Sequence, residues 1–409
     1  MAVRFFAILL AVFTVCSQFA CNSANTPAQQ LLSLQLVESP AAAGSGEPNL
    51  FASKDGRALL SWMEDLDNGK VALKFSEWQD SSWSVPQLVT SGDHWFVNWA
   101  DFPSMAMLND GTLVAHWLAK SAKSTYAYNV NIAFSKDDGG SWSTPIIPHR
   151  DGTQTEHGFV SLLPWQNDQL FTVWLDGRNF ADSGGHSESS EEMTLRSALL
   201  RPDGKIAHEV ELDDRTCECC QTSAALLPDG AIVAYRNRSD DEIRDIYVVR
   251  LEKGIWSEPQ CVFADNWRIS GCPVNGPALA TLEQSVVVAW FTAAGQKPEV
   301  KMAFSADGGK RFGAPILIND GEPMGRVDVV LLNQNTALVS WMEYQGDDGV
   351  IKMRRVSNNG SLENSQTIAL TGGSRASGFP RMVQSGQSIF FSWTKTGEKP
   401  QVMTALAKY

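Results

Sequence analysis

One eight-residue pattern occurs twice in this chain and constrains its fold more than any other feature of the sequence. Residues 135–142 read Ser-Lys-Asp-Asp-Gly-Gly-Ser-Trp, and residues 305–312 read Ser-Ala-Asp-Gly-Gly-Lys-Arg-Phe. Each copy follows an alternating strand and precedes a proline, Pro145 or Pro315. Aspartate can bond to its own backbone and glycine tolerates positive φ, so each copy suits a tight turn, over which the final aromatic ring packs. Two such turns predict a repeated structural unit.

A longer repeat runs through the whole chain from residue 32. Each unit has a strand, a tight turn, an apolar second strand that ends in an aromatic residue, a longer loop and a third strand. An apolar second strand is typical of a strand that is covered on both faces. The aromatic residues lie 51 to 61 positions apart, at Trp62, Trp117, Trp174, Tyr235, Trp290, Trp341 and Trp393.

Seven units of this kind predict an all-β fold, a seven-bladed β-propeller of four-stranded antiparallel blades, as one domain over residues 32–409. The last unit has only three strands before the chain ends. Residues 32–37 alternate well enough to supply its outer strand and close the ring.

The repeated turn is the Asp box, and on these two copies the chain resembles the superfamily of sialidases and related BNR-repeat propellers. The box is part of the scaffold in that superfamily and performs no chemistry. The resemblance implies six blades, as in sialidases, whereas the repeat count predicts seven. It also implies a glycoside hydrolase that acts on an acidic sugar.

The first 31 residues have the pattern of an exported protein. Residues 1–20 combine Arg4 with an apolar run that is too short to span a bilayer, which predicts an export signal. Gln18-Phe19-Ala20-Cys21 is similar to a bacterial lipobox, although Gln18 replaces the usual leucine. Residues 21–31 therefore suit a tether, with Cys21 either lipidated or simply secreted. Both alternatives place the protein outside the cytoplasm, in the periplasm or anchored to a membrane as a lipoprotein.

The charge balance limits the partners. The formal net charge is −13 at pH 7, and no basic stripe interleaves with aromatic residues. Nucleic acid and anionic membrane surfaces are therefore poor partners. A glycan or a small acidic ligand remains the expected partner.

The alternation of strand direction identifies one face as the candidate functional face. The loops before each inner strand and after each second strand share this face, here called the mouth side, and the Asp boxes lie on the opposite face. Ligand sites in such folds generally lie near the axis. The mouth-side candidates include Asp101, Glu156, His157, Asn275, Arg178, Arg236, Arg326, Arg381, Glu343 and Tyr344.

Four of these candidates are arginines from different units: Arg178, Arg236, Arg326 and Arg381. Guanidinium groups around one cavity suit a carboxylate through bidentate hydrogen bonds. The resemblance to sialidases, which hold a carboxylate with three arginines, implies Arg326 and Arg381 as members of the triad. The alternative interpretation pairs the arginines with Asp176, Asp245 and Asp328 between blades.

The same resemblance implies Asp101 as the acid/base and Glu343-Tyr344 as the nucleophile pair. The sequence departs from the sialidase pattern in two places. Glu47-Pro48-Asn49 stands where a Phe-Arg-Ile-Pro-like motif is expected, and no tyrosine precedes the last inner strand. Glu156 and His157 are either a further acid/base pair or a hydrogen-bonded structural pair.

A group of cysteines has no place in the sialidase pattern. Cys217, Cys219 and Cys220 precede the fourth inner strand, and Cys272 precedes the fifth. A disulfide between neighbouring blades is one interpretation in an exported protein. A thiolate metal site for copper(I) or zinc, with His157 as a further ligand, is the other. The spacing lacks the two paired C-x-x-C motifs of structural zinc sites. Cys261 lies in an outer-strand stretch, where it either packs as a small residue or pairs with one of the others.

Three functions follow from these patterns. The first is an exported glycoside hydrolase that acts on an acidic sugar through an arginine-lined mouth, with Asp101 as the proton donor. The second is a non-hydrolytic protein that binds carbohydrate, or a metal through the cysteine group. The third is an assembly module that uses one propeller face as a docking surface.

Overall fold

The computed structural model describes residue 1, residues 32–180 and residues 192–408. The predicted export signal and tether, including Cys21, lie outside the described residues. The 3-10 helices are η1 (Gln166–Asp168), η2 (Arg178–Phe180), η3 (Ala294–Gln296) and η4 (Arg375–Ser377). Within the described part of the chain, no helix is long and apolar enough to cross a membrane.

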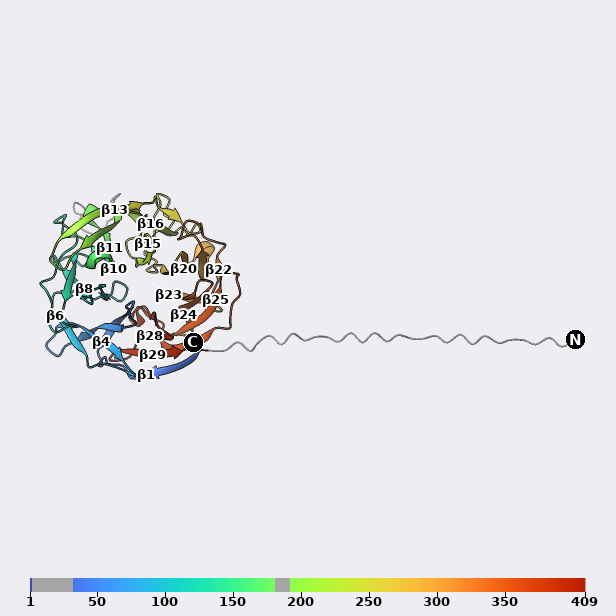
Figure 1. The fold of residues 1–409 in the computed structure, drawn as a ribbon, viewed down its shortest axis with the longest axis horizontal. Helices are drawn as coiled ribbons and strands as arrows, with labels where there is room; N and C mark the ends of the chain where they lie inside the picture. The colour runs from blue at the N-terminus through green and yellow to red at the C-terminus, as the bar shows by residue number, and fades with distance from the viewer. Residues whose placement is uncertain (2–31, 181–191, 409) are drawn as a thin grey trace. The chain divides into compact units, whose positions relative to one another are not determined.

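Seven antiparallel sheets follow one another around a central axis, so the seven-bladed propeller is confirmed (Figure 1). Blade 1 contains β2 (Ser45–Ala52), β3 (Ala58–Asp65), β4 (Val71–Gln79), β5 (Ser82–Trp83) and β6 (Gln87–Gly92). Blade 2 contains β7 (Ser104–Met107), β8 (Leu113–Lys120) and β9 (Tyr128–Ser135). Blade 3 contains β10 (His157–Trp165), β11 (Gln169–Asp176), β12 (Met193–Leu200) and β13 (Ile206–Thr216).

The remaining blades repeat the plan. Blade 4 contains β14 (Ser223–Leu227), β15 (Gly230–Arg236), β16 (Ile246–Glu252), β17 (Ile255–Trp256) and β18 (Gln260–Cys261). Blade 5 contains β19 (Ala278–Leu282), β20 (Ser285–Thr292), β21 (Glu299–Ser305) and β22 (Ile316–Leu317). Blade 6 contains β23 (Pro323–Asn333), β24 (Thr336–Gln345), β25 (Asp348–Ser357) and β26 (Gln366–Gly372). Blade 7 contains β27 (Arg381–Ser385), β28 (Ser388–Lys395), β29 (Gln401–Lys408) and β1 (Ser33–Val37).

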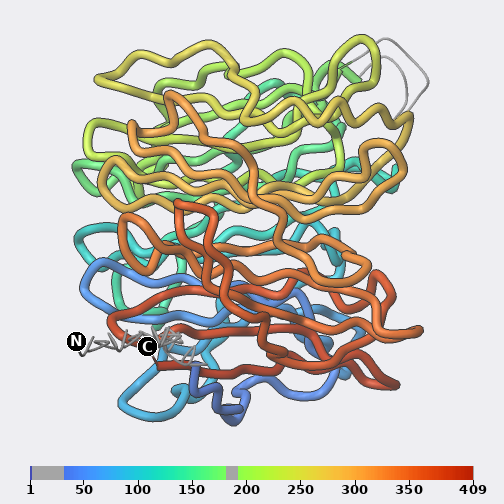
Figure 2. The backbone as a smooth tube through the Cα atoms, turned by 90° about the vertical axis from the view of Figure 1, so that its right-hand side faces the viewer, coloured from blue at the N-terminus to red at the C-terminus, as the bar shows by residue number. Residues whose placement is uncertain are grey.

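The two ends of the propeller close the ring together. Strand β1 pairs antiparallel with β29, from Ser33 opposite Lys408 to Val37 opposite Thr404, as predicted for residues 32–37. The blue strand β1 lies beside the red strands of blade 7 in Figure 1, and the first and last blades lie next to each other in Figure 2. Blade 7 thereby gains its fourth strand.

Blade 2 departs from the expected four strands. Its outer position holds a single bridge between Ile132 and Ile146. Pro145 and Pro148 flank this bridge, and proline has no backbone N–H to offer a ladder. The prolines explain why the pairing stops after one residue.

The two Asp boxes form tight turns after the third strands of blades 2 and 5. In the first box, Asp137 accepts hydrogen bonds from the Ser135 hydroxyl at 2.8 Å and from the Ser141 N–H at 2.8 Å. Gly139 has φ 90°, and an added Cβ there would lie 2.5 Å from the ring of Phe75. The Trp142 ring packs edge-on against Phe75 of blade 1, so the box also fastens two blades.

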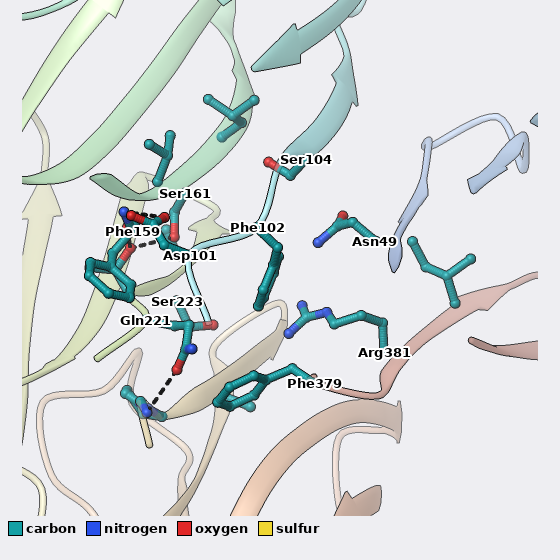
Figure 3. Close-up of a pocket in the computed structure, with 18 of the residues that line it drawn as sticks. Asn49, Asp101, Phe102, Ser104, Phe159, Ser161, Gln221, Ser223, Phe379 and Arg381 are labelled. Carbon is teal, nitrogen blue, oxygen red and sulfur yellow. Dashed lines mark hydrogen bonds between the residues drawn. The ribbon is translucent and has the colours of Figure 1, made fainter. Parts of the chain in front are cut away.

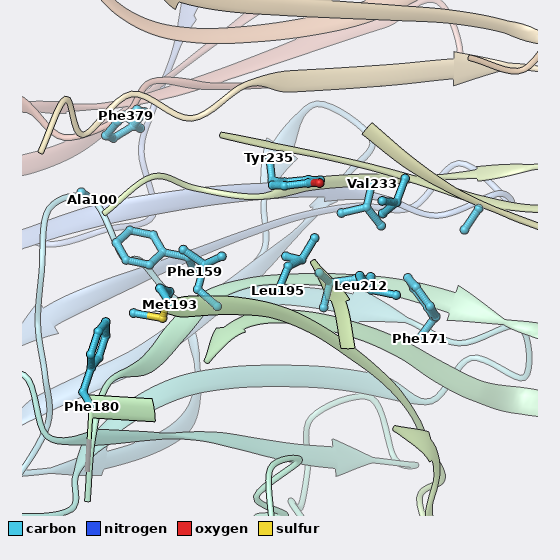
Figure 4. Packing of buried hydrophobic residues seen from close by; sticks show 14 residues of the cluster. Ala100, Phe159, Phe171, Phe180, Met193, Leu195, Leu212, Val233, Tyr235 and Phe379 are labelled. Carbon is cyan, nitrogen blue, oxygen red and sulfur yellow. The ribbon is translucent and has the colours of Figure 1, made fainter. Parts of the chain in front are cut away.

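The apolar core lies between blades, where the faces of neighbouring sheets meet. Figure 4 shows one such cluster, in which Phe171 and Leu195 of blade 3 pack with Val233 and Tyr235 of blade 4. The second strands are almost completely buried, as their apolar sequences predict.

Buried tryptophans at the ends of second strands donate their indole N–H to a carboxylate, and a lysine on the neighbouring strand pairs with the same carboxylate. Trp341 donates its indole N–H to Glu343 at 2.7 Å, and Lys352, its cross-strand neighbour, lies 2.7 Å from the same carboxylate. Trp62, Glu64 and Lys74 repeat this arrangement in blade 1, and Trp290, Asp265 and Lys301 form a variant in blade 5. We call each set a Trp–acid–base group.

We expect Glu343→Ala to lower the free energy of unfolding by about 3 kcal/mol, because it leaves a buried indole N–H and Lys352 without their acceptor. Urea unfolding followed by tryptophan fluorescence measures the loss. The control Glu363→Ala removes a more exposed carboxylate and should change stability by less than about 0.5 kcal/mol. A loss of under about 1 kcal/mol for Glu343→Ala would contradict a structural role for this carboxylate.

Candidate functional site

A cavity lies at the axis and is lined by residues from all seven blades. Figure 3 shows Asp101, Phe102 and Arg381 around it. Its polar lining consists of Asn49, Asp101, Ser104, Ser161, Gln221, Thr222, Ser223 and Arg381. Its large apolar side chains include Phe102, Phe159 and Phe379. The cavity therefore offers both aromatic faces and hydrogen-bonding groups.

Bulges in three inner strands aim backbone groups across the blade boundaries. The register shifts next to Glu47, Phe159 and Arg326, and each of these residues has φ near 50°. A bulge re-aims the side chains and N–H groups around it. The freed N–H groups of Phe159 and Arg326 become donors to the preceding blade.

Side chains near the starts of inner strands, including the predicted site residues Asp101 and Asn275, accept backbone N–H groups of the next blade and so connect neighbouring blades. Asp101 accepts the Phe159 N–H at 2.7 Å, Asn275 accepts the Arg326 N–H at 2.8 Å, and Asp328 accepts the Met382 N–H at 2.8 Å. Gln221 accepts the Gly276 N–H at 3.0 Å, a bond also drawn in Figure 3. We call these contacts inter-blade latches. The amide nitrogens of Asn275 and Gln221 also bond to backbone carbonyls, and the second oxygen of Asp328 accepts the Val329 N–H, so these side chains are held firmly in place.

The second oxygen of Asp101 belongs to a buried acid cluster. The Tyr128 hydroxyl lies 3.1 Å from Asp101 Oδ2 and 2.7 Å from Glu156 Oε1. One phenol hydrogen can serve only one of two carboxylates. An added Cβ at Gly158 would lie 2.0 Å from Asp101 Oδ2, so this close approach requires glycine.

Burial, together with the neighbouring Glu156, raises the pKa of Asp101 to about 7, against the hydrogen bonds from the Phe159 N–H and the Tyr128 hydroxyl. At neutral pH Asp101 is therefore close to half protonated. A carboxyl group in this state can donate a proton.

The four predicted arginines do not share one position. Arg178 pairs with Asp176 at 2.7 Å and Glu209 at 3.0 Å. The buried Arg236 donates to the carbonyls of Arg244, Asn275 and Phe291. Of the four, Arg381 lines the central cavity. The four guanidinium groups therefore do not meet in this cavity, because those of Arg178 and Arg236 are bound to the framework.

Arg326 and Arg381 nevertheless meet one aromatic cluster at the mouth side. Arg326 lies over Trp99 at 5.0 Å, and Arg381 lies over Phe102 at 5.5 Å. Phe379 stacks on Trp99 at 5.7 Å and touches Phe102 at 5.9 Å, which completes the cluster. We call Trp99, Phe102 and Phe379 the aromatic platform. A third arginine, Arg375, lies over Trp99 at 5.9 Å.

The guanidinium of Arg326 is buried and bonds to neutral groups. It donates to the Ser377 hydroxyl at 2.5 Å and to the carbonyls of Gly378 and Ser374 at 3.0 and 3.1 Å. Within the described residues, no ion pair of Arg326 with a carboxylate is found. Burial lowers the pKa of Arg326 to about 10, so it stays charged at neutral pH. It therefore gives the mouth a positive charge that no acid of residues 32–180 or 192–408 neutralises by direct contact. Arg381, by contrast, has Asp328 3.5 Å away.

Glu343 and Tyr344 do not form a pair that faces the cavity. Glu343 accepts four donors: the Trp341 indole, Lys352 and the N–H groups of Asp320 and Gly321. Burial alone would raise the pKa of Glu343, but the bonds from Lys352 and Trp341 hold it below its usual value. Tyr344 is 47% exposed. The structure therefore assigns Glu343 to a Trp–acid–base group.

Cys217, Cys219 and Cys220 form a triangle of free thiols. The Sγ atoms lie 3.6 Å apart for Cys217 and Cys219, 3.4 Å for Cys217 and Cys220, and 4.0 Å for Cys219 and Cys220. All five cysteines of the described residues are free thiols, so the disulfide is not present in this structure. Cys272 of the neighbouring blade lies with its Sγ 3.8 Å from Glu218 Oε1. Cys261 lies in the outer strand β18, as predicted.

The surroundings of the triangle favour a thiolate. Burial would raise the pKa of Cys217, but hydrogen bonds from Cys219 and Cys220 and the charges of Arg244 and Arg236 hold it well below the usual value. Arg244 Nη1 lies 3.2 Å from Cys217 Sγ. The triangle can therefore hold a metal ion.

His157 joins a different group from the one predicted. Its potential metal-binding partners are His149 and Asp151, and the cysteines form a separate group. Glu156, its neighbour in sequence, belongs to the acid cluster with Tyr128 and Asp101. The two adjacent residues thus face different environments.

Residues 58–391 match the family described as BNR repeat-like domain. The chain belongs to this family. No curated protein matches the sequence.

Solved structures similar to this BNR-repeat propeller share its fold at low identity. A protein of unknown function from Dyadobacter fermentans is 14% identical with a TM-score of 0.52, over 92% of this chain and 97% of that chain. Polysaccharide lyase Uly1 is 9% identical with a TM-score of 0.51, over 89% and 90% of the two chains. The NanB sialidase of Streptococcus pneumoniae is 8% identical with a TM-score of 0.48, over 92% and 94%. The first two likenesses, with TM-scores above 0.5, show the fold alone.

Sequence reasoning missed several residues of this BNR-repeat propeller. Tyr128 begins a third strand, a position on the mouth side, so the strand alternation could have identified it. Trp99 lies two residues before Asp101, in the same segment that leads into an inner strand. His149 and Asp151 lie between blades 2 and 3, and Arg375 lies in η4, where no strand pattern indicates a direction.

We expect the stability of the wild type to fall relative to Asp101→Asn as the pH rises from about 4 to about 7. The folded pKa of Asp101 lies above that of an unfolded aspartate, so the folded state holds an extra proton across this window and loses that advantage as the proton leaves. Asparagine cannot titrate. Urea unfolding of both proteins at several pH values measures the difference, and a difference that stays constant with pH would contradict the raised pKa.

Proposed function

We propose that this protein binds an acidic carbohydrate at the mouth of the central cavity. The observation that carries the proposal is the aromatic platform with Arg326, Arg375 and Arg381 around it. Guanidinium groups match carboxylates through paired hydrogen bonds. Aromatic faces cover the apolar face of a sugar ring, and a concave site with few polar groups is typical of a ligand pocket.

The charge of the site favours an acidic ligand over a neutral one. Arg326 is 6% exposed, and its described bonds go to a hydroxyl and to carbonyl groups. A buried charge without a counter-ion is costly, and a carboxylate at the mouth would offset that cost. A polysaccharide lyase with the same fold is consistent with a carbohydrate ligand.

The chemistry that we propose for this site is hydrolysis of a glycosidic bond with Asp101 as the general acid. Asp101 lines the cavity, and its raised pKa of about 7 keeps a protonated fraction at neutral pH. The proton would pass from Asp101 to the oxygen of the leaving sugar. Activity of this kind would fall as the pH rises above about 7.

We expect Arg381→Ala and Arg375→Ala each to weaken binding of uronic-acid and sialic-acid oligosaccharides by at least tenfold, because each removes a charged partner of the carboxylate. Titration calorimetry against each acidic oligosaccharide and its carboxyl-reduced neutral counterpart measures the effect. The matched control is Arg311→Ala, which removes an exposed arginine from the Asp box on the opposite face.

Two outcomes would contradict this proposal. One is equal affinity for the acidic and the neutral oligosaccharide, and the other is an unchanged affinity in both arginine variants. Turnover of the bound oligosaccharide, reduced at least 100-fold in Asp101→Asn, would distinguish a hydrolase from a binding protein.

A second candidate function, binding of copper(I) or zinc, is supported by the thiol triangle. Thiolates that surround a zinc ion at about 2.3 Å lie about 3.8 Å from one another. The three Sγ–Sγ distances, 3.4 to 4.0 Å, bracket this value. Soft thiolate ligands suit both ions, and Cys272 would be the fourth ligand for tetrahedral zinc. The export signal proposed for residues 1–20 would bring these thiols into an oxidising compartment, where a bound metal would protect them.

We expect the reduced full-length protein to bind one equivalent of zinc or copper(I) at the cysteines, with Cys220→Ser weakening binding by at least tenfold because one thiolate is lost. Metal analysis after dialysis, together with a thiol count, measures both. The control Cys261→Ser changes an outer-strand cysteine away from the triangle and should keep full affinity. Protein that binds no metal at the cysteines, or that holds a disulfide within the triangle after purification, would contradict this candidate.

A further inference from the structure

A second group of potential metal ligands lies between blades 2 and 3. His149 and Asp151 belong to the segment that joins the two blades, and His157 begins β10. Asp151 Oδ2 lies 3.4 Å from His149 Nδ1 and 3.3 Å from His157 Nε2. The two imidazole rings stack in parallel, with centroids 3.7 Å apart and planes 3° apart. Three ligand atoms on three residues thus converge on one small volume.

The tautomer of His157 makes this convergence unfavourable without a cation. His157 Nδ1 lies 3.3 Å from the carbonyl oxygen of Thr155, so Nδ1 carries the hydrogen and donates it. In the neutral ring, Nε2 then offers only a lone pair. It faces Asp151 Oδ2 and also Asp176 Oδ1 at 3.6 Å, both of which are acceptors. Arg178 offsets part of the repulsion among these three acceptors, because its Nε donates to Asp176 Oδ1 and its Nη2 lies 3.6 Å from Asp151 Oδ2. No hydrogen lies between His157 Nε2 and Asp151 Oδ2 in this tautomer, so a cation between these two atoms would be stabilising.

The burial of these side chains is a separate reason to expect a bound cation. The side chain of His157 is fully buried, those of His149 and Asp151 are 4% and 7% exposed, and His157 Nε2 and Asp151 Oδ2 have no hydrogen-bond partner. Buried polar atoms without partners are costly, and such atoms in a folded protein call for an ion or another ligand.

The surroundings orient the ligands as those of metal sites do. The Thr153 N–H donates to Asp151 Oδ1 at 2.9 Å, and the Thr153 hydroxyl bonds to the same oxygen, so Oδ2, which has Arg178 Nη2 3.6 Å away, is the oxygen that would bind an ion. The Thr155 carbonyl fixes the ring of His157 through Nδ1. Hydrogen bonds of this kind to the outer atoms of the ligands are usual around protein-bound metals.

We propose that His149, Asp151 and His157 bind a divalent transition-metal ion of the zinc class. Two imidazole nitrogens and one carboxylate oxygen are a ligand set that zinc takes in proteins, with a further position open to water or substrate. Asp176 stays outside the ligand set, because Arg178 and the Trp174 indole already bind its two oxygens. The site uses none of the cysteines and none of the arginines around the aromatic platform, so it is independent of both proposed functions.

The experiment uses the full chain with the thiol triangle disabled by Cys217→Ser and Cys220→Ser. Zinc and cobalt(II) are titrated into this protein, and metal content, calorimetry and the visible spectrum of the cobalt form are recorded. We expect one equivalent to bind, and a cobalt spectrum without the intense charge-transfer absorption that thiolate ligands produce. Asp151→Asn on the same background should weaken zinc binding by at least tenfold and abolish the rise in melting temperature that zinc causes.

Two further variants keep the result interpretable. His149→Gln tests the site if Asp151→Asn fails to fold, as judged by circular dichroism. His94→Ala removes a histidine whose side chain is 89% exposed and should leave zinc binding unchanged. The proposal is overturned if the Cys217→Ser, Cys220→Ser protein binds no zinc, or if Asp151→Asn and His149→Gln bind it as tightly as their parent. It is also overturned if nitrogen NMR finds His157 doubly protonated at neutral pH and unaffected by zinc.

Discussion

The fold depends on satisfying the indole N–H of tryptophans that are buried in the middle of the blades. A second strand covered on both faces has to be apolar, and a large ring at its end fills the space between sheets. The ring brings one polar hydrogen with it, and in blades 1, 5 and 6 a carboxylate accepts this hydrogen while a lysine from the next strand balances the charge. The blade can thus bury its largest side chain without leaving a donor unpaired.

The same logic governs the residues that surround the axis. Inner strands of neighbouring blades converge there, and their bulges leave N–H groups that point across the boundary. Asp101 and Asn275 accept these groups, and Asp328 and Gln221 accept other N–H groups of the next blade, so polar residues near the starts of the inner strands hold the ring together. Asp101 also lines the cavity and has a raised pKa, which makes it part of the frame and a candidate for chemistry at once. The hydrogen bonds that join neighbouring blades therefore also hold the side chains of the candidate site in place.

The fold could be predicted from the sequence, whereas the arrangement of side chains at the candidate site could not. Blade number, the strand at residues 32–37 and the positions of the Asp boxes follow from periodicity and turn chemistry, which are local properties. The direction of a long side chain depends on its partners, which can lie far away in the sequence. Arg178 and Arg236 both follow second strands on the mouth side. The guanidinium of Arg178 nevertheless pairs with the carboxylate of Asp176, and that of Arg236 donates to backbone carbonyls. Glu343 had the residue type of a catalytic acid, but its four donors show it to be structural. His149 and Asp151 lie in an irregular segment where no repeat pattern marks a residue.

The pairing of β1 with β29 makes closure of the ring a late step in folding. Ser33 and Lys408 are partners, so the last ladder to form joins segments at opposite ends of the propeller. The entropy of closing so long a loop grows only logarithmically with its length, so the closed ring is not much penalised at equilibrium. Kinetically the step comes late, because distant contacts form slowly. Until β1 pairs with β29, the edge of β29 has unpaired backbone groups. At this stage β29 can pair with the β1 strand of another copy of the chain instead.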